Sequence, residues 1–227
     1  ALRNPVVLAQ QVATLDRIAE GRVILGIGIA ADVRNIRAEF TAASVPFDKR
    51  VGRLVEGMAL CRALWTGKPV DWDGRWRVAG GVLGPMPHRP GGPPIWVAGA
   101  QPASLQRVGK HFDGWLPNGP SAARWGEQWR EVEAIARGAG RDPSALAGGM
   151  YLTLAVDDDQ QRAELRLEAY LQRYYGRPAA EMRSRQACYA GPAQGMADWL
   201  QAYVAAGTSH LVLRFAGDHE RHLETVA

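Results

Sequence analysis

Residues Arg22 to Phe40 combine an apolar run, two glycines and a carboxylate, a combination that can serve ligand chemistry. Gly26 and Gly28 interrupt the run, and because glycine has no Cβ, the backbone there can turn sharply and approach a bound molecule. Asp32 follows this turn, so its carboxylate is a candidate to exchange a proton with a substrate. The same side chain could instead cap a helix expected from Asp32 to Phe40, and we favour the cap.

Two further patterns indicate other chemistry, and both are weaker. Gly26-x-Gly28 follows an apolar run, as in the dinucleotide-binding fingerprint, but the third glycine and the acidic residue about 20 positions later are missing. His219 and His222, beside Asp218, have a spacing that could hold zinc if a third ligand came near. A polar C-terminal helix explains these histidines better, so we expect no metal site.

The composition narrows the class of protein. A chain of 227 residues that is 47% apolar can bury one substantial core, which predicts a single domain over residues 1–227. The net charge of +4 is spread along the chain, which favours an anionic small ligand over nucleic acid. Cys61 and Cys188 each lie in an apolar helical pattern without CxxC spacing, which predicts buried free thiols and a cytoplasmic location. No apolar run reaches the roughly 18 residues of a membrane span.

Strand and helix patterns alternate along the chain. Short apolar runs predict five strands, at residues 23–27, 94–98, 113–117, 150–156 and 210–215. Amphipathic patterns predict helices at residues 5–19, 32–40, 51–65, 102–111, 121–139, 160–175 and 193–206. Residues 69–93 depart from this rhythm, and Trp72 to Trp76 are typical of a hairpin within an insertion over the ligand face.

The buried faces of some elements can also be predicted. The first helix should begin at Pro5 behind an Asn4 N-cap. Its inward face is expected to hold Leu8, Val12, Leu15 and Ala19. Trp96 and Trp115 lie within strands, so they are expected in the core and not stacked on a ligand.

The alternation of strands and helices implies parallel pairing through right-handed crossovers, which makes the fold class α/β. A closed (β/α)8 barrel has eight strands in about 250 residues, whereas this chain offers five strands and opens on a helix. We therefore expect a (β/α)8 TIM barrel that lacks its first three strands. An unclosed parallel sheet exposes strand edges, so the isolated chain is expected to be poorly soluble.

Several segments, in this order, resemble the bacterial luciferase-like monooxygenase superfamily. They are NPVVLAQQVATLDRIAEGRVILGIG, then EF and VPFDKR, then RALWTGKPV, and last GPPIWVAGAQPASLQRVGKHFDGW. The resemblance is densest from Asn4 to Trp115 and weak from Ser121 to Gln194. It implies a barrel that binds FMN or the deazaflavin coenzyme F420, for hydride transfer or, with FMN and oxygen, for monooxygenation. The family's catalytic groups come largely from its first strands, so only Asp32 stands as a candidate.

The same resemblance places two loops on the cofactor. The first consists of Gly28, Ile29 and Ala30. The second consists of Gly99, Ala100, Gln101 and the helix start near Ser104. Free N–H groups of a turn and of a helix N-terminus can hold a phosphate in the second loop. Gly99 is expected to be its most sensitive position, because a Cβ would meet the ligand or force the turn out of its conformation, at more cost to affinity than to the fold.

Residue 29 favours the deazaflavin. FMN-dependent relatives commonly carry an arginine there, which can pair with phosphate, whereas this chain has Ile29. Deazaflavin relatives more often have a glycine and an aromatic residue in place of Ala30 and Ala31, so that pattern is not met either. Glu39 and Arg50 also match the family, and an ion pair explains them as well as chemistry does.

The expected function is therefore an oxidoreductase that uses coenzyme F420, with FMN as the alternative cofactor. It would transfer hydride between the cofactor and an unidentified small organic substrate. An FMN-dependent monooxygenase and a non-catalytic flavin-binding remnant of the barrel are the alternatives. We expect no nucleic-acid or membrane partner, and a homodimer is compatible with each alternative.

Overall fold

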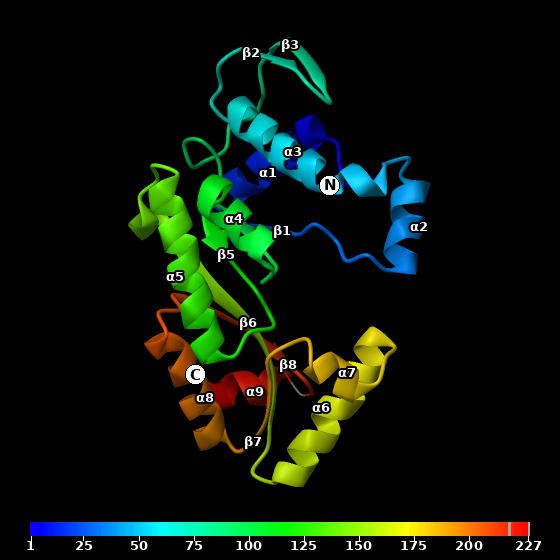
Figure 1. Ribbon diagram of the computed structural model, residues 1–227, viewed down its shortest axis with the longest axis vertical. Helices are drawn as coiled ribbons and strands as arrows, with labels where there is room; N and C mark the ends of the chain where they lie inside the picture. Colours follow the sequence, from blue (N-terminus) through cyan, green and yellow to red (C-terminus); the bar gives the residue numbers. More distant parts are fainter. Residues whose placement is uncertain (218, 227) are drawn as a thin grey trace. The chain divides into compact units, whose positions relative to one another are not determined.

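The computed structural model describes residues 1–217 and 219–226, and the chain divides into two compact units, Ala1–Trp96 and Val97–Ala227 (Figure 1). The division falls within strand β4 (Ile95–Val97). Each unit has its own helices and strands and is described by itself. A single domain over residues 1–227, with residues 69–93 as an insertion, stays a prediction.

The first unit is mainly helical. Besides the start of β4, it contains α1 (Pro5–Ile18), β1 (Leu25–Ile27), α2 (Arg34–Ala42), the 3-10 helix η1 (Phe47–Lys49), α3 (Arg50–Leu64), β2 (Val70–Asp73) and β3 (Arg77–Gly81). β2 and β3 pair antiparallel, with Trp72 opposite Val78, which confirms the predicted hairpin. β1 lies beside the segment leading into β4, where the Leu25 N–H donates to the Pro94 carbonyl at 2.9 Å.

Helix α1 begins as predicted, but its buried face is shifted from the predicted one. Asn4 Oδ1 accepts the Val6 N–H at 2.9 Å, which confirms the N-cap. Leu15, predicted to face inward, is 52% exposed, whereas Ala9 and Ala13 are fully buried. The physical reason is close packing: the small side chain of Ala9 lets the indole of Trp65, just past α3, donate to the Ala9 carbonyl at 2.9 Å. The inward position predicted for Val12 is therefore confirmed, since it is 6% exposed, and the one predicted for Leu15 is wrong.

The second unit is built around one long strand. After β4 it contains α4 (Pro102–His111), β5 (Gly114–Trp115), α5 (Ala122–Gly138), the 3-10 helix η2 (Pro143–Ala145), β6 (Ala147–Val156), α6 (Gln160–Tyr175), α7 (Ala179–Arg183), β7 (Cys188–Gly191), α8 (Ala193–Ala205), β8 (His210–Phe215) and α9 (His219–Val226). β6 pairs in parallel with β5, β7 and β8. Parallel strands joined by helices confirm the α/β class, while the absence of three further strands stays a prediction.

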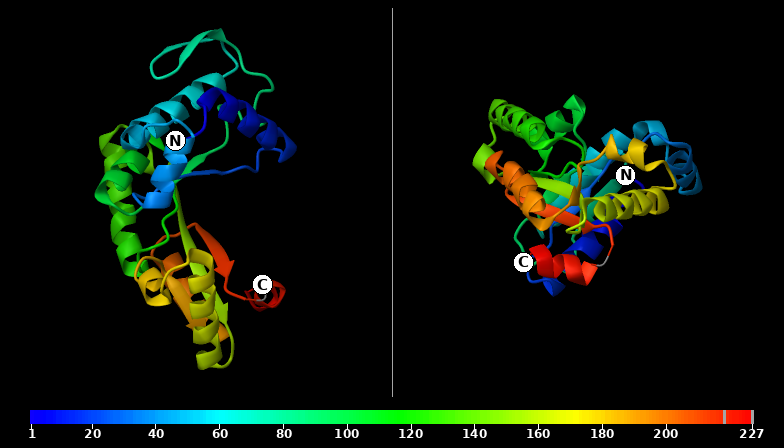
Figure 2. Two further views of the ribbon diagram at one scale, coloured as in Figure 1. Left: turned by 90° about the vertical axis from the view of Figure 1, so that its right-hand side faces the viewer. Right: turned by 90° about the horizontal axis from the view of Figure 1, so that it is seen from below.

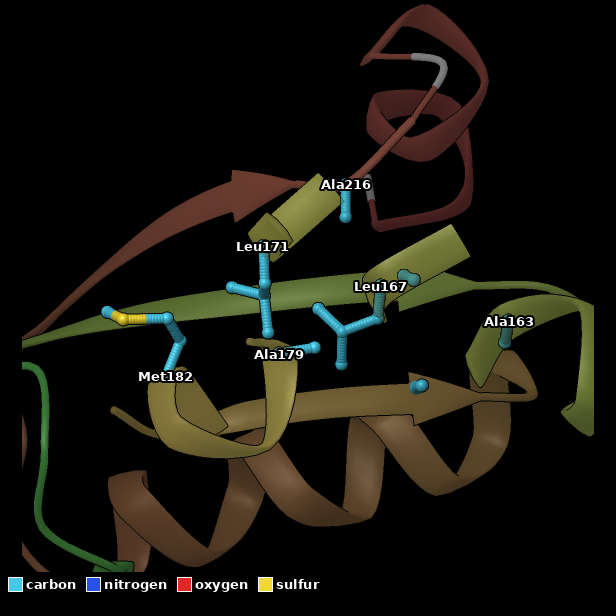
Figure 3. Close-up of a cluster of buried hydrophobic side chains, with 8 residues drawn as sticks. Ala163, Leu167, Leu171, Ala179, Met182 and Ala216 are labelled. Atoms are coloured by element: carbon cyan, nitrogen blue, oxygen red, sulfur yellow. The ribbon is translucent and has the colours of Figure 1, made fainter. Parts of the chain in front are cut away.

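Helices cover both sides of the β6–β7 pair (Figure 2). Alternate residues of a strand point to opposite sides, and in β7 the ring of Tyr189 contacts Trp199 of α8, with ring centroids 5.7 Å apart. Cys188 and Ala190 point the other way, into an apolar cluster beneath α6 and α7 (Figure 3). The fully or nearly buried members of this cluster are Ala155, Ala163, Leu167, Leu171, Ala179, Met182, Ala190 and Ala216.

The predicted helical setting of Cys188 is wrong, because this residue begins strand β7. Four residues are too few to show a strand period, and only the cover of α6 on one side and α8 on the other makes the segment a strand. Both cysteines are free, as predicted; Cys61 is buried and Cys188 is half-buried. Burial raises the pKa of the Cys61 thiol to about 12 and that of Cys188 to about 11, so neither is a reactive thiolate at neutral pH. Within the described ranges, no helix is long and apolar enough to cross a membrane.

Candidate functional site

The turn between β4 and α4 has its carbonyl groups tied to buried side chains. Gly99 adopts φ +103°, which glycine reaches without the strain that a Cβ would bring. The Gly99 carbonyl accepts the Trp115 indole N–H at 2.8 Å, and the Ala100 carbonyl accepts the Gln128 amide at 2.8 Å. Because Trp115 is fully buried and Gln128 is 5% exposed, both carbonyls are drawn toward the interior of the unit.

These two hydrogen bonds fix the direction of the opposite edges of the same peptides. In a trans peptide the N–H points away from the C=O, so the N–H groups of Ala100 and Gln101 turn away from Trp115 and Gln128. No described residue accepts the N–H of Ala100, Gln101 or Ala103. Successive free N–H groups at a turn form a concave anion-binding site.

The start of α4 adds to this arrangement. The helix has ten residues and begins with Pro102, and its N-cap residue Gln101 makes no side-chain cap. Its N-terminus therefore presents unpaired N–H groups and the positive end of the helix dipole. Ser104 is 7% exposed, and its Oγ lies 2.9 Å from where a Cβ on Gly99 would be. The structure thus brings together the four residues predicted for the phosphate loop, and a Cβ at Gly99 would fill part of that cradle.

Sequence reasoning missed Trp115 and Gln128 as determinants of this loop. The core position predicted for Trp115 is confirmed, and its ring stacks on Trp125 with centroids 5.6 Å apart. The indole N–H, however, serves the Gly99 turn, which no local pattern reveals. Gln128 did carry a signal, since an amide on the inner face of an amphipathic helix needs a partner in the interior.

The other predicted cofactor loop, Gly28 to Ala30, lines a cavity of about 290 Å³ in the first unit. That volume is just below the range of typical small-molecule sites, which is roughly 300–1,000 Å³. No atom lies within 4 Å of where a Cβ would stand on Gly26 or Gly28, so packing in the protein does not demand glycine at either position. The space beside the backbone is open to a ligand.

Ala30 is a strained member of the same loop. Its φ of +70° lies in the left-handed region, which alanine occupies at a cost and glycine does not. A glycine is what the deazaflavin relatives were expected to carry at this position, and the backbone keeps a glycine-like conformation despite the substitution. Glu20 and Ser44 also have positive φ, but they follow the ends of α1 and α2, whereas Ala30 lies in the loop that lines the cavity.

The walls of the cavity are mostly apolar, with a few charged groups. The apolar side chains come from α1, β1, α2, α3 and the hairpin, and include Leu8, Leu25, Ile27, Phe40, Leu54, Met58 and Trp76. Glu39 and Arg53 also line it, and the Arg53 guanidinium lies 4.8 Å from the centre of the Trp76 ring. Such a lining suits a flat, largely apolar group with polar atoms at its edge.

Asp32 does not cap the following helix, so that prediction was wrong. α2 begins at Arg34 with Val33 as its N-cap residue and has no side-chain cap. The carboxylate instead accepts two hydrogen bonds from Arg37, at 2.5 and 2.8 Å, because the helix start lies two residues later than expected. The hydrogen bond from Arg37 lowers the pKa of Asp32, so the carboxylate stays ionised at lower pH than an ordinary aspartate does.

The suggested ion pair of Glu39 with Arg50 is also not formed. The Arg50 guanidinium lies over the Phe47 ring, 3.8 Å from its centre, and donates to the Phe47 carbonyl at 3.2 Å. Glu39 faces the cavity instead. Glu39, which matches the family pattern, is therefore one of the residues that line the candidate site.

The C-terminal histidines belong to a helix, as predicted. His219 and His222 are on α9, and His222 is 1% exposed with its Nε2 accepting the Val156 N–H at 2.9 Å. Asp218, the third member of that pattern, lies outside the described residues. Residues 1–217 and 219–226 contain no group of three His, Cys, Asp or Glu side chains able to hold a metal ion.

Comparison with known proteins gives the family context. A family model described as luciferase-like monooxygenase matches residues 1–227. The F420-dependent glucose-6-phosphate dehydrogenase of Nocardia farcinica is 27% identical over 245 residues, which cover 96% of this chain and 70% of the relative. The phthiodiolone/phenolphthiodiolone dimycocerosates ketoreductase of Mycobacterium bovis is 32% identical over 173 residues, covering 74% of this chain and 44% of the relative.

A solved structure has the same fold. An F420-dependent secondary alcohol dehydrogenase, determined in complex with an F420–acetone adduct, superposes with a TM-score of 0.77. The match covers 94% of this chain and 70% of that one at 21% sequence identity. At this identity the likeness establishes the fold, in agreement with the α/β barrel class expected from the sequence.

Proposed function

The chain belongs to the luciferase-like monooxygenase family, and from this premise we propose that it is an oxidoreductase that uses coenzyme F420. Hydride would pass between the deazaflavin and a small organic molecule. The observation that carries the proposal is the Gly99 turn, where two buried side chains hold the carbonyls inward and leave N–H groups free for an anion. The similarity to the F420-dependent glucose-6-phosphate dehydrogenase of Nocardia farcinica also supports F420 as the cofactor.

The residues of the cradle would hold the phosphate of the cofactor. The N–H groups of Ala100, Gln101 and Ala103 supply hydrogen bonds, and the start of α4 supplies a positive dipole end. Bound deazaflavin supplies the ring carbon that gives or takes the hydride. The protein's part is to fix the cofactor by its phosphate, since a group held in one orientation reacts without a further entropy cost.

Ile29 supports F420 over FMN as the cofactor. Its side chain is an apolar member of the cavity wall in the first unit and offers no guanidinium to a phosphate. FMN is the alternative cofactor.

Asp32 enters this proposal only in its ionised form. Arg37 lowers the pKa of the carboxyl through a bidentate hydrogen bond. A proton donor must hold its proton at the working pH, so Asp32 is not proposed as an acid. The group that exchanges the substrate proton is left unassigned.

Titration with the two cofactors tests the proposal. The fluorescence anisotropy of F420 and the absorbance of FMN report binding without the need for a substrate. We expect F420 to bind more tightly than FMN. Tight binding of FMN with no binding of F420 would sink the deazaflavin assignment, and binding of neither would refute the proposed function.

The proposal includes a cytoplasmic location, a small-molecule substrate and no nucleic-acid partner. It is supported by the free thiols of Cys61 and Cys188, which suit a reducing compartment. A homodimer is a further part of it, and analytical ultracentrifugation of the protein would decide that point.

A further inference from the structure

Arg107 lies one turn after Ser104 on α4, and its guanidinium has no anionic partner among the described residues. The Nε atom is buried without a hydrogen-bond partner, and no carboxylate in the described part of the chain pairs with the side chain. Burial lowers the pKa of Arg107, and no described carboxylate offsets that effect. Removing a cation from water costs free energy unless an anion compensates it, so this arginine is placed at a cost to the unliganded protein.

The contact that Arg107 does make leads to the phosphate cradle. Its Nη2 donates to Ser104 Oγ at 3.0 Å. A hydroxyl has one hydrogen to donate and two lone pairs, so the bond from Arg107 occupies a lone pair and leaves the hydroxyl hydrogen for another acceptor. Ser104 Oγ lies beside the Gly99 turn, 2.9 Å from where a Cβ on Gly99 would be. The free hydrogen is therefore available on the side of the unpaired N–H groups.

We propose that Arg107 is the positioning residue of the phosphate site, orienting the Ser104 hydroxyl toward the ligand and providing the positive charge that the bound phosphate compensates. The inference rests on the proposed function and gives a role to Arg107, to which the sequence alone assigned none. The ligand chemistry is a phosphate ester, and the phosphodiester of F420 is the source to which we assign it. Arg107 acts through Ser104 and is not itself a group that reacts.

The test compares Arg107→Gln with Lys110→Gln, which removes the same charge from the exposed last turn of the same helix. We expect Arg107→Gln to weaken F420 binding by roughly tenfold or more, as for the loss of a hydrogen bond to a charged group. Lys110→Gln should bind F420 as the parent does. Arg107→Lys should recover part of the affinity, since it keeps the charge but lacks the guanidinium fork.

Two readouts separate a phosphate role from a structural one. The deazaflavin chromophore without its phosphate-bearing tail should bind the parent and Arg107→Gln equally. The melting temperature of the ligand-free protein should stay the same or rise in Arg107→Gln, because the variant removes a half-buried charge that has no anionic partner among the described residues. Equal loss of both ligands, or a fall in the ligand-free melting temperature that accounts for the affinity loss, would overturn the inference.

Inorganic phosphate serves as a second probe, which separates this inference from the proposed function. If the parent binds F420 and Arg107→Gln binds it equally well, only the role of Arg107 is refuted. If the parent binds no cofactor, but phosphate raises its melting temperature and fails to do so in Arg107→Gln, the phosphate site stands and the proposed function falls. If the parent responds to neither F420 nor phosphate, both are refuted.

Discussion

The Gly99 turn of the second unit and the Gly28–Ala30 loop of the first are both glycine turns after a strand, but they are held in different ways. At Gly99, hydrogen bonds from Trp115 and Gln128 fix the peptides from behind. No such bond holds the carbonyls of Gly28, Ile29 or Ala30 among the described residues. A polar cradle for an anion needs its dipoles fixed in advance, whereas an apolar wall needs only shape.

The glycines of the two loops also differ in whether the protein itself requires them. Gly99 is required by the protein, since its φ is positive and a Cβ would meet Ser104 Oγ at 2.9 Å. At Gly26 and Gly28, no protein atom lies within 4 Å of the point that a Cβ would occupy, so their role depends on what enters the cavity. The comparison indicates that a side chain at Gly26 or Gly28 should cost the fold little, whereas one at Gly99 should strain the turn.

The largest effect is expected from Gly99→Ala. Loss of about one or two phosphate contacts should weaken F420 binding by roughly 10- to 100-fold. Strain at φ +103° should also lower the free energy of unfolding by about 1–3 kcal/mol, which is more than the sequence alone suggested for this loop. Cofactor titration and chemical denaturation measure the two effects.

Gly140→Ala is the matched control for that variant. Gly140 also has positive φ, at +72°, but no atom lies within 4 Å of its Cβ position. It should lose about 1 kcal/mol of stability and keep the parent affinity. If both variants bound F420 equally well, Gly99 would serve the fold and the phosphate would lie elsewhere.

An intermediate effect is expected from Gln128→Met. The change removes the donor to the Ala100 carbonyl while keeping the length of the side chain. The Ala100–Gln101 peptide can then rotate, and the Gln101 N–H is no longer fixed in the direction away from Gln128. F420 affinity should fall by about five- to tenfold, the worth of roughly one oriented hydrogen bond. Stability should change by less than about 1 kcal/mol, because the buried Oε1 of Gln128, which has no partner among the described residues, is removed at the same time.

Gln172→Met on the exposed face of α6 provides the comparison for Gln128→Met. It changes the same atoms in an exposed side chain that donates to no backbone carbonyl among the described residues. Similar affinity in the two variants would show that the Ala100 peptide keeps its direction without Gln128, and the contrast between the two loops would then be lost.

The smallest effect on F420 affinity is expected from replacing Asp32 or Asp157, one aspartate in each unit. These replacements should instead change the stability of the folded protein at acid pH. Hydrogen bonds from arginine lower the pKa of Asp32 and of Asp157, with Arg37 and Arg162 as the respective donors. A carboxyl with a lowered folded pKa contributes stability above its unfolded pKa, near 4, and loses it as pH falls further. In Asp32→Asn and in Asp157→Asn, the free energy of unfolding should therefore depend less on pH below about 4 than it does in the parent.

The two aspartates should differ in size of effect. The Asp157 side chain is 2% exposed and bonded to Arg162 and Arg166, whereas that of Asp32 is 56% exposed and bonded to Arg37. Solvent screens the exposed pair, so Asp157→Asn should flatten the acid limb more than Asp32→Asn. Urea midpoints between about pH 2 and pH 6 measure this, and a larger change for Asp32→Asn would contradict it.

The sequence by itself determined the elements that have strong local signals. α4 and α6 begin and end where predicted, because Pro102, the Asp159 cap and Gly176 act on the backbone within a few residues. β8 also has its predicted bounds. The glycine turn after an apolar strand, and with it Gly99 as a loop residue, could be identified in the same way.

Only the tertiary structure decided which side chains make that turn a site. Trp115 and Gln128 reach Gly99 and Ala100 across 16 and 28 residues of sequence. The same holds for β7, which is a strand because α6 and α8 cover it. Local patterns report what the backbone prefers over one or two turns, whereas the direction of a single N–H depends on a partner brought near by folding.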